Sequence, residues 1–124
     1  MKPLILIVDD EPANIHFLVE ALGGNFRIKV ATSGDDALRI AQSAEKPDLI
    51  LLDVMMPGLS GYDVCKTLKE EETTRAIPVI FITAMGTPES EAFGLELGAV
   101  DYICKPINIE VTKARVRTHI ELKR

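Results

Sequence analysis

Residues 4–11 read Leu-Ile-Leu-Ile-Val-Asp-Asp-Glu, an apolar run that ends in three acidic residues. Residues 49–53, Leu-Ile-Leu-Leu-Asp, repeat this pattern. A hydroxyl ends the run at 79–83, Val-Ile-Phe-Ile-Thr, and Lys105 follows the short run at 102–104. If the four runs are parallel strands of one sheet, their polar groups lie at its carboxyl edge, where open α/β folds build their sites. The sequence therefore predicts one crevice with carboxylates, a hydroxyl and an amine, a set suited to a divalent metal and a phosphoryl group.

Apolar runs alternate with helical patterns five times, which is typical of βα units around a parallel sheet. Strands are expected over 4–8, 27–31, 48–52, 79–82 and 100–104, and helices over 12–22, 34–46, 62–72, 88–97 and from 109 onward. In the second helix, Ala37, Ile40, Ala41 and Ala44 should face the core. The first, third and fourth strands are almost wholly apolar, so they should be central. These features predict an α/β fold, a doubly wound five-stranded parallel sheet of flavodoxin-like order 2-1-3-4-5 with five helices.

Composition bounds the class of protein. The 124 residues are 47% hydrophobic and 27% charged, as expected for one globular domain. A net charge of −5 without a basic run disfavours direct nucleic-acid binding, and no membrane span or signal peptide is evident. Cys65 and Cys104 lack a CxxC spacing and are interpreted as buried reduced thiols of a cytoplasmic protein. The last helix lacks a stop signal before Arg124, so we expect residues 1–124 to be the N-terminal module of a longer protein.

Adjacent carboxylates repel each other, and a cation is the natural way to keep them ionised. Mg²⁺ prefers one or two carboxylates with further oxygen ligands, which Asp10, Asp53 and the backbone carbonyl of Met55 would supply. Alternatively, the acidic residues at 9–11 only cap the first helix, and Asp53 only caps a loop. Instead of capping a loop, Asp53 could act as a carboxylate nucleophile. Thr83, Lys105 and Tyr102 also have ordinary interpretations: a strand-end hydroxyl, a surface charge and a core aromatic residue.

Taken in order, four segments make a specific pattern: Ile-Val-Asp-Asp-Glu at 7–11, Asp-Val-Met-Met-Pro-Gly-Leu-Ser-Gly at 53–61, Ile-Thr-Ala at 82–84 and Gly-Ala-Val-Asp-Tyr-Ile-Cys-Lys-Pro at 98–106. Over essentially its whole length, the chain resembles the receiver domain of two-component response regulators. The resemblance implies a phosphoacceptor at Asp53, and a Mg²⁺ pocket that includes Asp9 and Asp10. It further implies phosphoryl contacts from Thr83 and Lys105, a switch aromatic at Tyr102, and a cis peptide bond before Pro106.

The resemblance also implies partners and a mode of action. A sensor histidine kinase or phosphotransfer protein would phosphorylate Asp53, and the helix starting at Pro88, the strand at 100–104 and the helix after Asn108 would form the switching face. The C-terminal segment resembles family members in which the receiver domain precedes another module, such as a cyclic-dinucleotide output domain, a kinase or a second receiver. Departures are mild: Ile107 stands where the family often has Phe, and Met55 and Met85 occupy variable positions beside the site.

Two other functions are considered. An aspartyl-phosphate hydrolase would need an acid or base two residues past Asp53, where Met55 stands, and a lid that no connection is long enough to form. A phosphorylation-independent docking module does not need the phosphorylation residues, which are all present. We therefore expect no enzymatic activity beyond the domain's own phosphorylation and dephosphorylation.

A homodimer through the switching face is a further expectation, since acidic residues of one helix could pair with basic residues of the other across a two-fold axis. The alternative is that these charges are only solvated. The acidic residues are Glu89, Glu91 and Glu96, and the basic ones Lys113, Arg115, Arg117, Lys123 and Arg124.

Overall fold

The computed structural model describes residues 2–84 and 86–123, in which strands and helices alternate along the chain. The strands are β1 (Leu4–Val8), β2 (Arg27–Ala31), β3 (Leu49–Asp53), β4 (Val79–Thr83) and β5 (Asp101–Cys104). The helices are α1 (Pro12–Leu22), α2 (Gly34–Ala41), α3 (Gly61–Glu70), α4 (Pro88–Glu96) and α5 (Ile109–Lys123). The five strands form one parallel sheet in the order β2-β1-β3-β4-β5. This arrangement confirms the predicted fold class and strand order.

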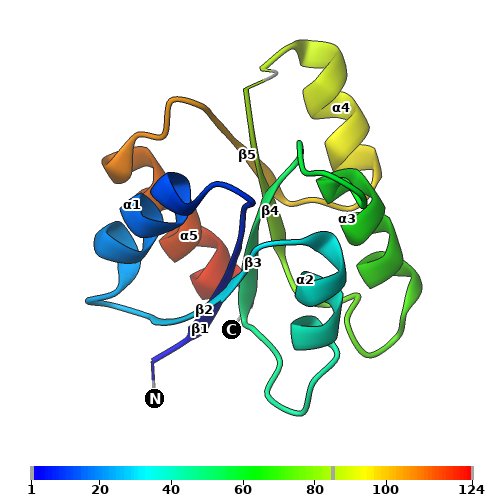
Figure 1. Cartoon of the computed structure of the whole chain (residues 1–124), viewed down its shortest axis with the longest axis horizontal. Helices are drawn as coiled ribbons and strands as arrows, with labels where there is room; N and C mark the ends of the chain where they lie inside the picture. The colour runs from blue at the N-terminus through cyan, green and yellow to red at the C-terminus, as the bar shows by residue number, and fades with distance from the viewer. Residues whose placement is uncertain (1, 85, 124) are drawn as a thin grey trace.

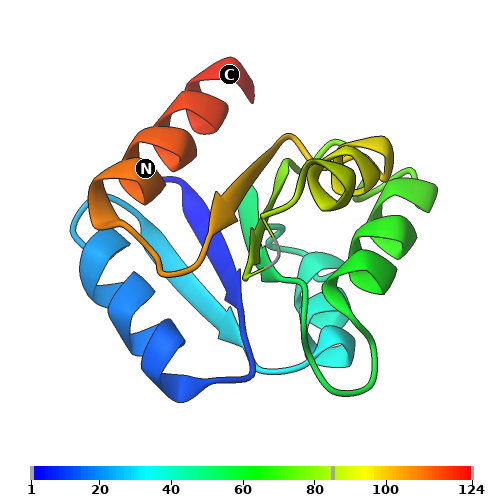
Figure 2. The same ribbon diagram turned by 90° about the horizontal axis from the view of Figure 1, so that it is seen from above.

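Helices cover both faces of the sheet, with α1 and α5 on one side and α2, α3 and α4 on the other (Figure 1). The view from above shows the same division (Figure 2). Side chains alternate across each strand, so Ile5 and Ile7 join the core beneath α1 and α5. Leu6 and Val8 join the core beneath the other three helices. Both faces of the central strands are therefore buried, which explains their unbroken apolar sequence.

Capping residues fix where most helices begin. The Ser33 hydroxyl accepts the Asp36 N–H (3.2 Å), and the Asn108 side chain accepts the Val111 N–H (3.0 Å). Thr87 caps α4, whose first residue is Pro88, and Ser60 forms a capping box with Asp63. The predicted starts of α2, α4 and α5 are confirmed by these bonds.

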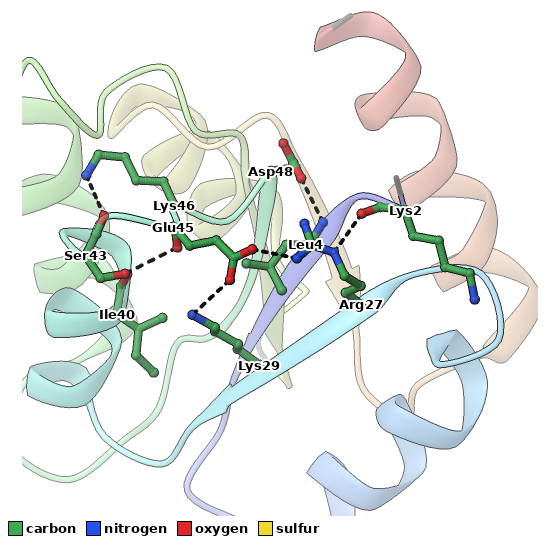
Figure 3. A network of polar contacts seen from close by, with 9 residues as sticks. All are labelled: Lys2, Leu4, Arg27, Lys29, Ile40, Ser43, Glu45, Lys46 and Asp48. Atoms are coloured by element: carbon green, nitrogen blue, oxygen red, sulfur yellow. Dashed lines mark hydrogen bonds and ion pairs between the residues drawn. The ribbon is translucent and has the colours of Figure 1, made fainter.

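The end of α2 differs from the prediction, because the helix stops at Ala41 and not near Lys46. The N–H and the hydroxyl of Ser43 both donate to the Ile40 carbonyl (3.1 and 2.6 Å), which closes the helix in a tight turn. Lys46 Nζ then donates to the Ser43 carbonyl (3.0 Å; Figure 3). Ala44 is consequently exposed, and its predicted place in the core is wrong.

Figure 3 also shows the contacts made by the charged residues of the edge strand β2. Arg27 donates to the Lys2 carbonyl (3.0 Å) and to the Glu45 carboxylate (2.6 Å). Lys29 forms a second ion pair with Glu45 (3.5 Å). The two contacts with Glu45 attach β2 to the connection between α2 and β3, and the contact with Lys2 attaches it to the segment before β1. They explain why an edge strand alternates charged with apolar residues.

Two remaining expectations concern the cysteines and the membrane. Cys65 is buried, as predicted. Cys104 is exposed, because it is the last residue of the edge strand β5, and its prediction as a buried thiol is wrong. Within residues 2–84 and 86–123, no helix combines the length and apolar character that crossing a membrane requires.

Candidate functional site

Three carboxylates meet at the carboxyl edge of the sheet. Asp9 and Asp10 directly follow β1, and Asp53 is the last residue of its neighbour β3. One carboxylate oxygen of each residue lies within 4.8 Å of the others. The chain connections reverse direction between these two strands, which is the switch point at which this class of fold binds ligands. The structure therefore brings the three predicted carboxylates into one cluster.

Asp9 is the most confined of the three, with 1% of its surface exposed. Its Oδ1 accepts the N–H of Glu11 (2.9 Å). Its Oδ2 is buried and has no hydrogen-bond partner among the described residues. Glu11 occupies the position before α1, but its side chain makes no cap bond. Helix capping alone therefore does not account for the acidic residues at 9–11. A buried carboxylate oxygen without a donor is costly, and a divalent cation would satisfy it.

Asp53 is also 1% exposed, and its Oδ1 faces two donors. The N–H of Met55 lies 3.3 Å away and Nζ of Lys105 lies 3.4 Å away. Burial raises the pKa of Asp53, the negative charge of Asp9 raises it further, and the positive charge of Lys105 opposes both. The result is a pKa of about 6, against 3.8 for an ordinary aspartate.

Gly61, at the start of α3, determines how the loop after Asp53 packs. Its N–H donates to the Val54 carbonyl (2.9 Å). A Cβ at this position would overlap the Asp53 carbonyl and lie 2.8 Å from the Val54 Cα. Only glycine lets α3 begin directly against the backbone of Asp53. Sequence reasoning included Gly61 in a motif but did not anticipate this contact.

Thr83 and Lys105 reach the same edge from β4 and the end of β5. Thr83 closes β4 and is buried, and its carbonyl accepts the Lys105 N–H (2.8 Å). The following peptide bond, between Lys105 and Pro106, is cis. Lys105 is therefore held by its backbone beside Thr83 while its ammonium group faces Asp53. Met85, the second methionine expected beside the site, lies outside the described residues.

Tyr102 lies beneath α4 and is 5% exposed. Its hydroxyl donates to the Ser90 carbonyl, and its ring centroid lies 5.7 Å from that of Phe81. Tyr62 of α3 then contacts Phe81 (5.2 Å) and Phe93 of α4 (4.9 Å), both edge-to-face. This aromatic cluster (Tyr62, Phe81, Phe93 and Tyr102) joins α3, β4, β5 and α4, and sequence reasoning found only Tyr102. The other three carried no signal beyond their aromatic character.

On the other side of β5, side chains of α5 contact Asp101, the residue before Tyr102. Asp101 accepts bonds from Arg115 (2.7 Å) and pairs with His119 (3.0 Å), while Arg115 also donates to the Tyr102 carbonyl (2.6 Å). Burial alone would raise the pKa of Asp101. The bonds from His119 and the Tyr102 N–H, together with the charge of Arg115, outweigh burial and lower it. Lys123 pairs with Asp48 (3.7 Å), so part of the predicted basic surface of α5 is neutralised within the chain.

Comparison with known proteins agrees with this geometry. The family model described as the response regulator receiver domain matches residues 5–117. The chain belongs to this family. A receiver domain structure from a Francisella response regulator, 29% identical, superimposes with a TM-score of 0.92 over 99% of this chain and 100% of that one.

Two longer proteins contain a closely similar segment. A "Probable cyclic di-GMP phosphodiesterase" of Vibrio cholerae is 51% identical over 97% of this chain and 27% of its own length. Response regulator PleD of Caulobacter vibrioides is 44% identical over 99% of this chain and 27% of its own length. This receiver domain thus spans about a quarter (27%) of the length of these curated relatives.

Receiver domains generally bind Mg²⁺ at an acidic pocket, and the residues of this receiver domain fit such an ion. The fit rests on the buried, unpartnered Oδ2 of Asp9 and on the nearby oxygens of Asp10 and Asp53. Carboxylate oxygens are the ligands that this hard cation prefers.

We expect Asp9→Asn to stabilise the metal-free receiver domain while weakening its affinity for Mg²⁺. Because the pKa of Asp53 is raised in the fold, its contribution to stability is present below about pH 4 and is lost as pH rises through about 6. Removing the charge of Asp9 removes one cause of that rise. The free energy of unfolding in chelator should therefore increase at pH 7 by on the order of 1 kcal/mol, and little at pH 4.

Urea unfolding in chelator at pH 4 and pH 7 measures this difference, and calorimetric titration measures Mg²⁺ binding. The exposed residue Glu72 provides the matched control, Glu72→Gln, which should change neither quantity. A stability gain as large at pH 4 as at pH 7 would show that repulsion of the Asp53 charge is not the cause.

Proposed function

We propose that this receiver domain accepts a phosphoryl group on Asp53, in a Mg²⁺-dependent reaction, from a phosphohistidine of a sensor histidine kinase or phosphotransfer protein. The observation that carries the proposal is the position of Asp53: a buried carboxylate in a cluster with Asp9 and Asp10, with Nζ of Lys105 3.4 Å from its Oδ1. A carboxylate can form an acyl phosphate when cations screen the incoming negative charge.

The residues divide the chemistry among them. With a pKa of about 6, Asp53 is mostly ionised at neutral pH, so an oxygen lone pair is available to attack phosphorus. The new O–P bond forms as the P–N bond breaks, and the departing electron pair stays on the imidazole nitrogen of the donor. Lys105 screens the charge on the phosphoryl oxygens, and the Thr83 hydroxyl provides a further contact. Bound Mg²⁺, held by Asp9, Asp10, Asp53 and the Met55 carbonyl, would neutralise charge on the same oxygens.

The phosphoryl group would act on the rest of the domain through β4 and β5. It adds negative charge beside Thr83 and Lys105, which are joined by a backbone hydrogen bond. Tyr102 lies two residues before Cys104, the register partner of Thr83. A shift of Thr83 toward the phosphoryl group would thus change the packing of Tyr102, and with it the face formed by α4, β5 and α5.

The cellular setting is part of the proposal. Residues 1–124 would act as the N-terminal module of a longer cytoplasmic protein, and the switching face would control its output module. The predicted homodimer through the same face stays a prediction. Its charge pairing is weaker than the sequence suggests, because Arg115 and Lys123 already pair with Asp101 and Asp48.

Incubation with acetyl phosphate, followed by intact mass measurement, tests this function against its alternatives. We expect one phosphoryl adduct per chain with Mg²⁺ and none in excess chelator. Sustained consumption of the donor without an adduct would indicate a hydrolase. No adduct and no consumption would indicate a docking module that is independent of phosphorylation.

We expect the adduct to be long-lived, because Met55 cannot orient a water for its hydrolysis. Met55, two residues beyond Asp53, is 62% exposed, and its thioether is only a weak hydrogen-bond acceptor. Met55→Asn supplies an amide there and should accelerate loss of the phosphoryl group by about tenfold or more. Intact mass at intervals after donor removal gives the rate.

The buried neighbour Met56 provides the matched control, because Met56→Leu conserves volume and should leave the rate unchanged. Equal or slower decay in Met55→Asn would contradict the proposed role of Met55.

A further inference from the structure

Gly94 of α4 is buried directly against the ring of Tyr102. A Cβ at this position would overlap the Tyr102 hydroxyl and would lie 2.7 Å from Cε2 and 2.8 Å from Cζ. Such distances are shorter than the 3.0 Å below which real Cβ atoms are essentially never found. The tyrosine ring therefore occupies the space that any side chain at position 94 would need.

The Tyr102 ring is held in place by contacts with α4 and with Phe81. Its hydroxyl donates to the carbonyl of Ser90, one helical turn before Gly94, so α4 contacts the ring at two consecutive turns. The ring also packs against Phe81, with 5.7 Å between the two ring centroids, and Phe81 in turn contacts Tyr62. A methyl group at 94 would have to separate the ring from α4, because interiors packed at this density do not absorb an extra atom.

We propose that Gly94 is a positioning residue for the phosphorylation switch, holding Tyr102 against α4 so that the two respond together to Asp53. This inference rests on the proposed function. Phe81 and Thr83 lie on the same side of β4, and their register partners are Tyr102 and Cys104. Movement of Thr83 would therefore reach α4 through the Tyr102 ring, and only while that ring stays in contact with Gly94 and Ser90.

The chain offers a direct probe, because it contains two tyrosines and no tryptophan. Labelling with 3-fluorotyrosine gives two ¹⁹F resonances, and Tyr62→Phe assigns them. We expect Gly94→Ala to move the Tyr102 resonance toward that of a solvent-exposed tyrosine without any phosphate analogue. Gly24→Ala is the control, since a Cβ at Gly24 meets no described atom within 4 Å, and it should leave the resonance unchanged.

Coupling to Asp53 is measured with beryllofluoride and Mg²⁺, an analogue of the aspartyl phosphate. In the unsubstituted domain, beryllofluoride should shift the Tyr102 resonance and change amide hydrogen exchange in α4. In Gly94→Ala the analogue should still bind, because Asp53 is untouched, but the change in α4 exchange should be lost. If beryllofluoride does not bind the unsubstituted domain, the proposed function fails and the switching role of Gly94 fails with it.

Testing Gly94→Ala a second time, in a variant that lacks the Tyr102 ring, distinguishes this role from a general effect on folding. Tyr102→Val removes the ring, and alanine then favours the helix over glycine. Gly94→Ala should therefore lower the thermal midpoint when Tyr102 is present and raise it in Tyr102→Val. The same sign in both backgrounds, or an unmoved Tyr102 resonance in Gly94→Ala, would overturn the proposal even if Asp53 is phosphorylated as expected.

Discussion

Asp53→Asn is expected to leave the receiver domain folded and to abolish the adduct formed from acetyl phosphate. Asparagine fills the same volume between the Met55 N–H and Lys105, but its amide has no ionised oxygen to attack phosphorus. Intact mass after incubation with the donor and Mg²⁺ measures the yield. The loss should be complete, because Asp53 is the member of the carboxylate cluster that pairs with Lys105.

Asp35→Asn is the control for this experiment, since Asp35 is an exposed carboxylate in the first turn of α2. It should give the same yield of adduct as the unsubstituted domain. A full yield from Asp53→Asn would show that another residue accepts the phosphoryl group.

The second large effect concerns stability. Phe81 is fully buried in the central strand β4 and contacts both Tyr62 and Tyr102. Phe81→Ala should lower the free energy of unfolding by about 3–5 kcal/mol, because it removes a large apolar side chain and leaves a cavity between strand and helices. Urea unfolding measures the difference.

Phe93 provides a matched control of the same residue type. It belongs to the same aromatic cluster but is 49% exposed on α4. Phe93→Ala should therefore cost only about 1 kcal/mol, close to the value of one aromatic pair. Equal losses from the two variants would contradict the burial that the structure assigns to Phe81.

The strands and their order could be predicted from the sequence because a strand that is buried on both faces has an almost unbroken apolar sequence. The runs at β1, β3 and β4 are apolar at almost every position, and each matches its predicted extent to within a residue. Helix ends were harder to predict. α2 stops at Ala41 because the Ser43 hydroxyl donates to the Ile40 carbonyl. A serine within a helical pattern does not indicate from the sequence whether it will make such a bond.

The candidate site could be predicted in outline for a similar reason. Parallel strands bring their carboxyl ends to one edge, so Asp9, Asp10 and Asp53 had to meet if the strand order was right. The contact of Gly61 with the Asp53 backbone and that of Gly94 with Tyr102 could not be predicted. Each contact depends on how a helix packs against the sheet. The sequence does not distinguish a helical glycine that is required by such a close contact from one that is not.

Location of the phosphoryl group tests the central claim most directly. The domain is incubated with acetyl phosphate and Mg²⁺, reduced with borohydride, digested and analysed by peptide mass spectrometry. Hydride converts an aspartyl phosphate to an alcohol and releases phosphate, which marks the acceptor permanently. We predict reduction at Asp53 alone, and none when chelator replaces Mg²⁺. Reduction at another carboxylate, or an adduct that survives borohydride without a reduced aspartate, would contradict the assignment of Asp53 as the phosphoacceptor.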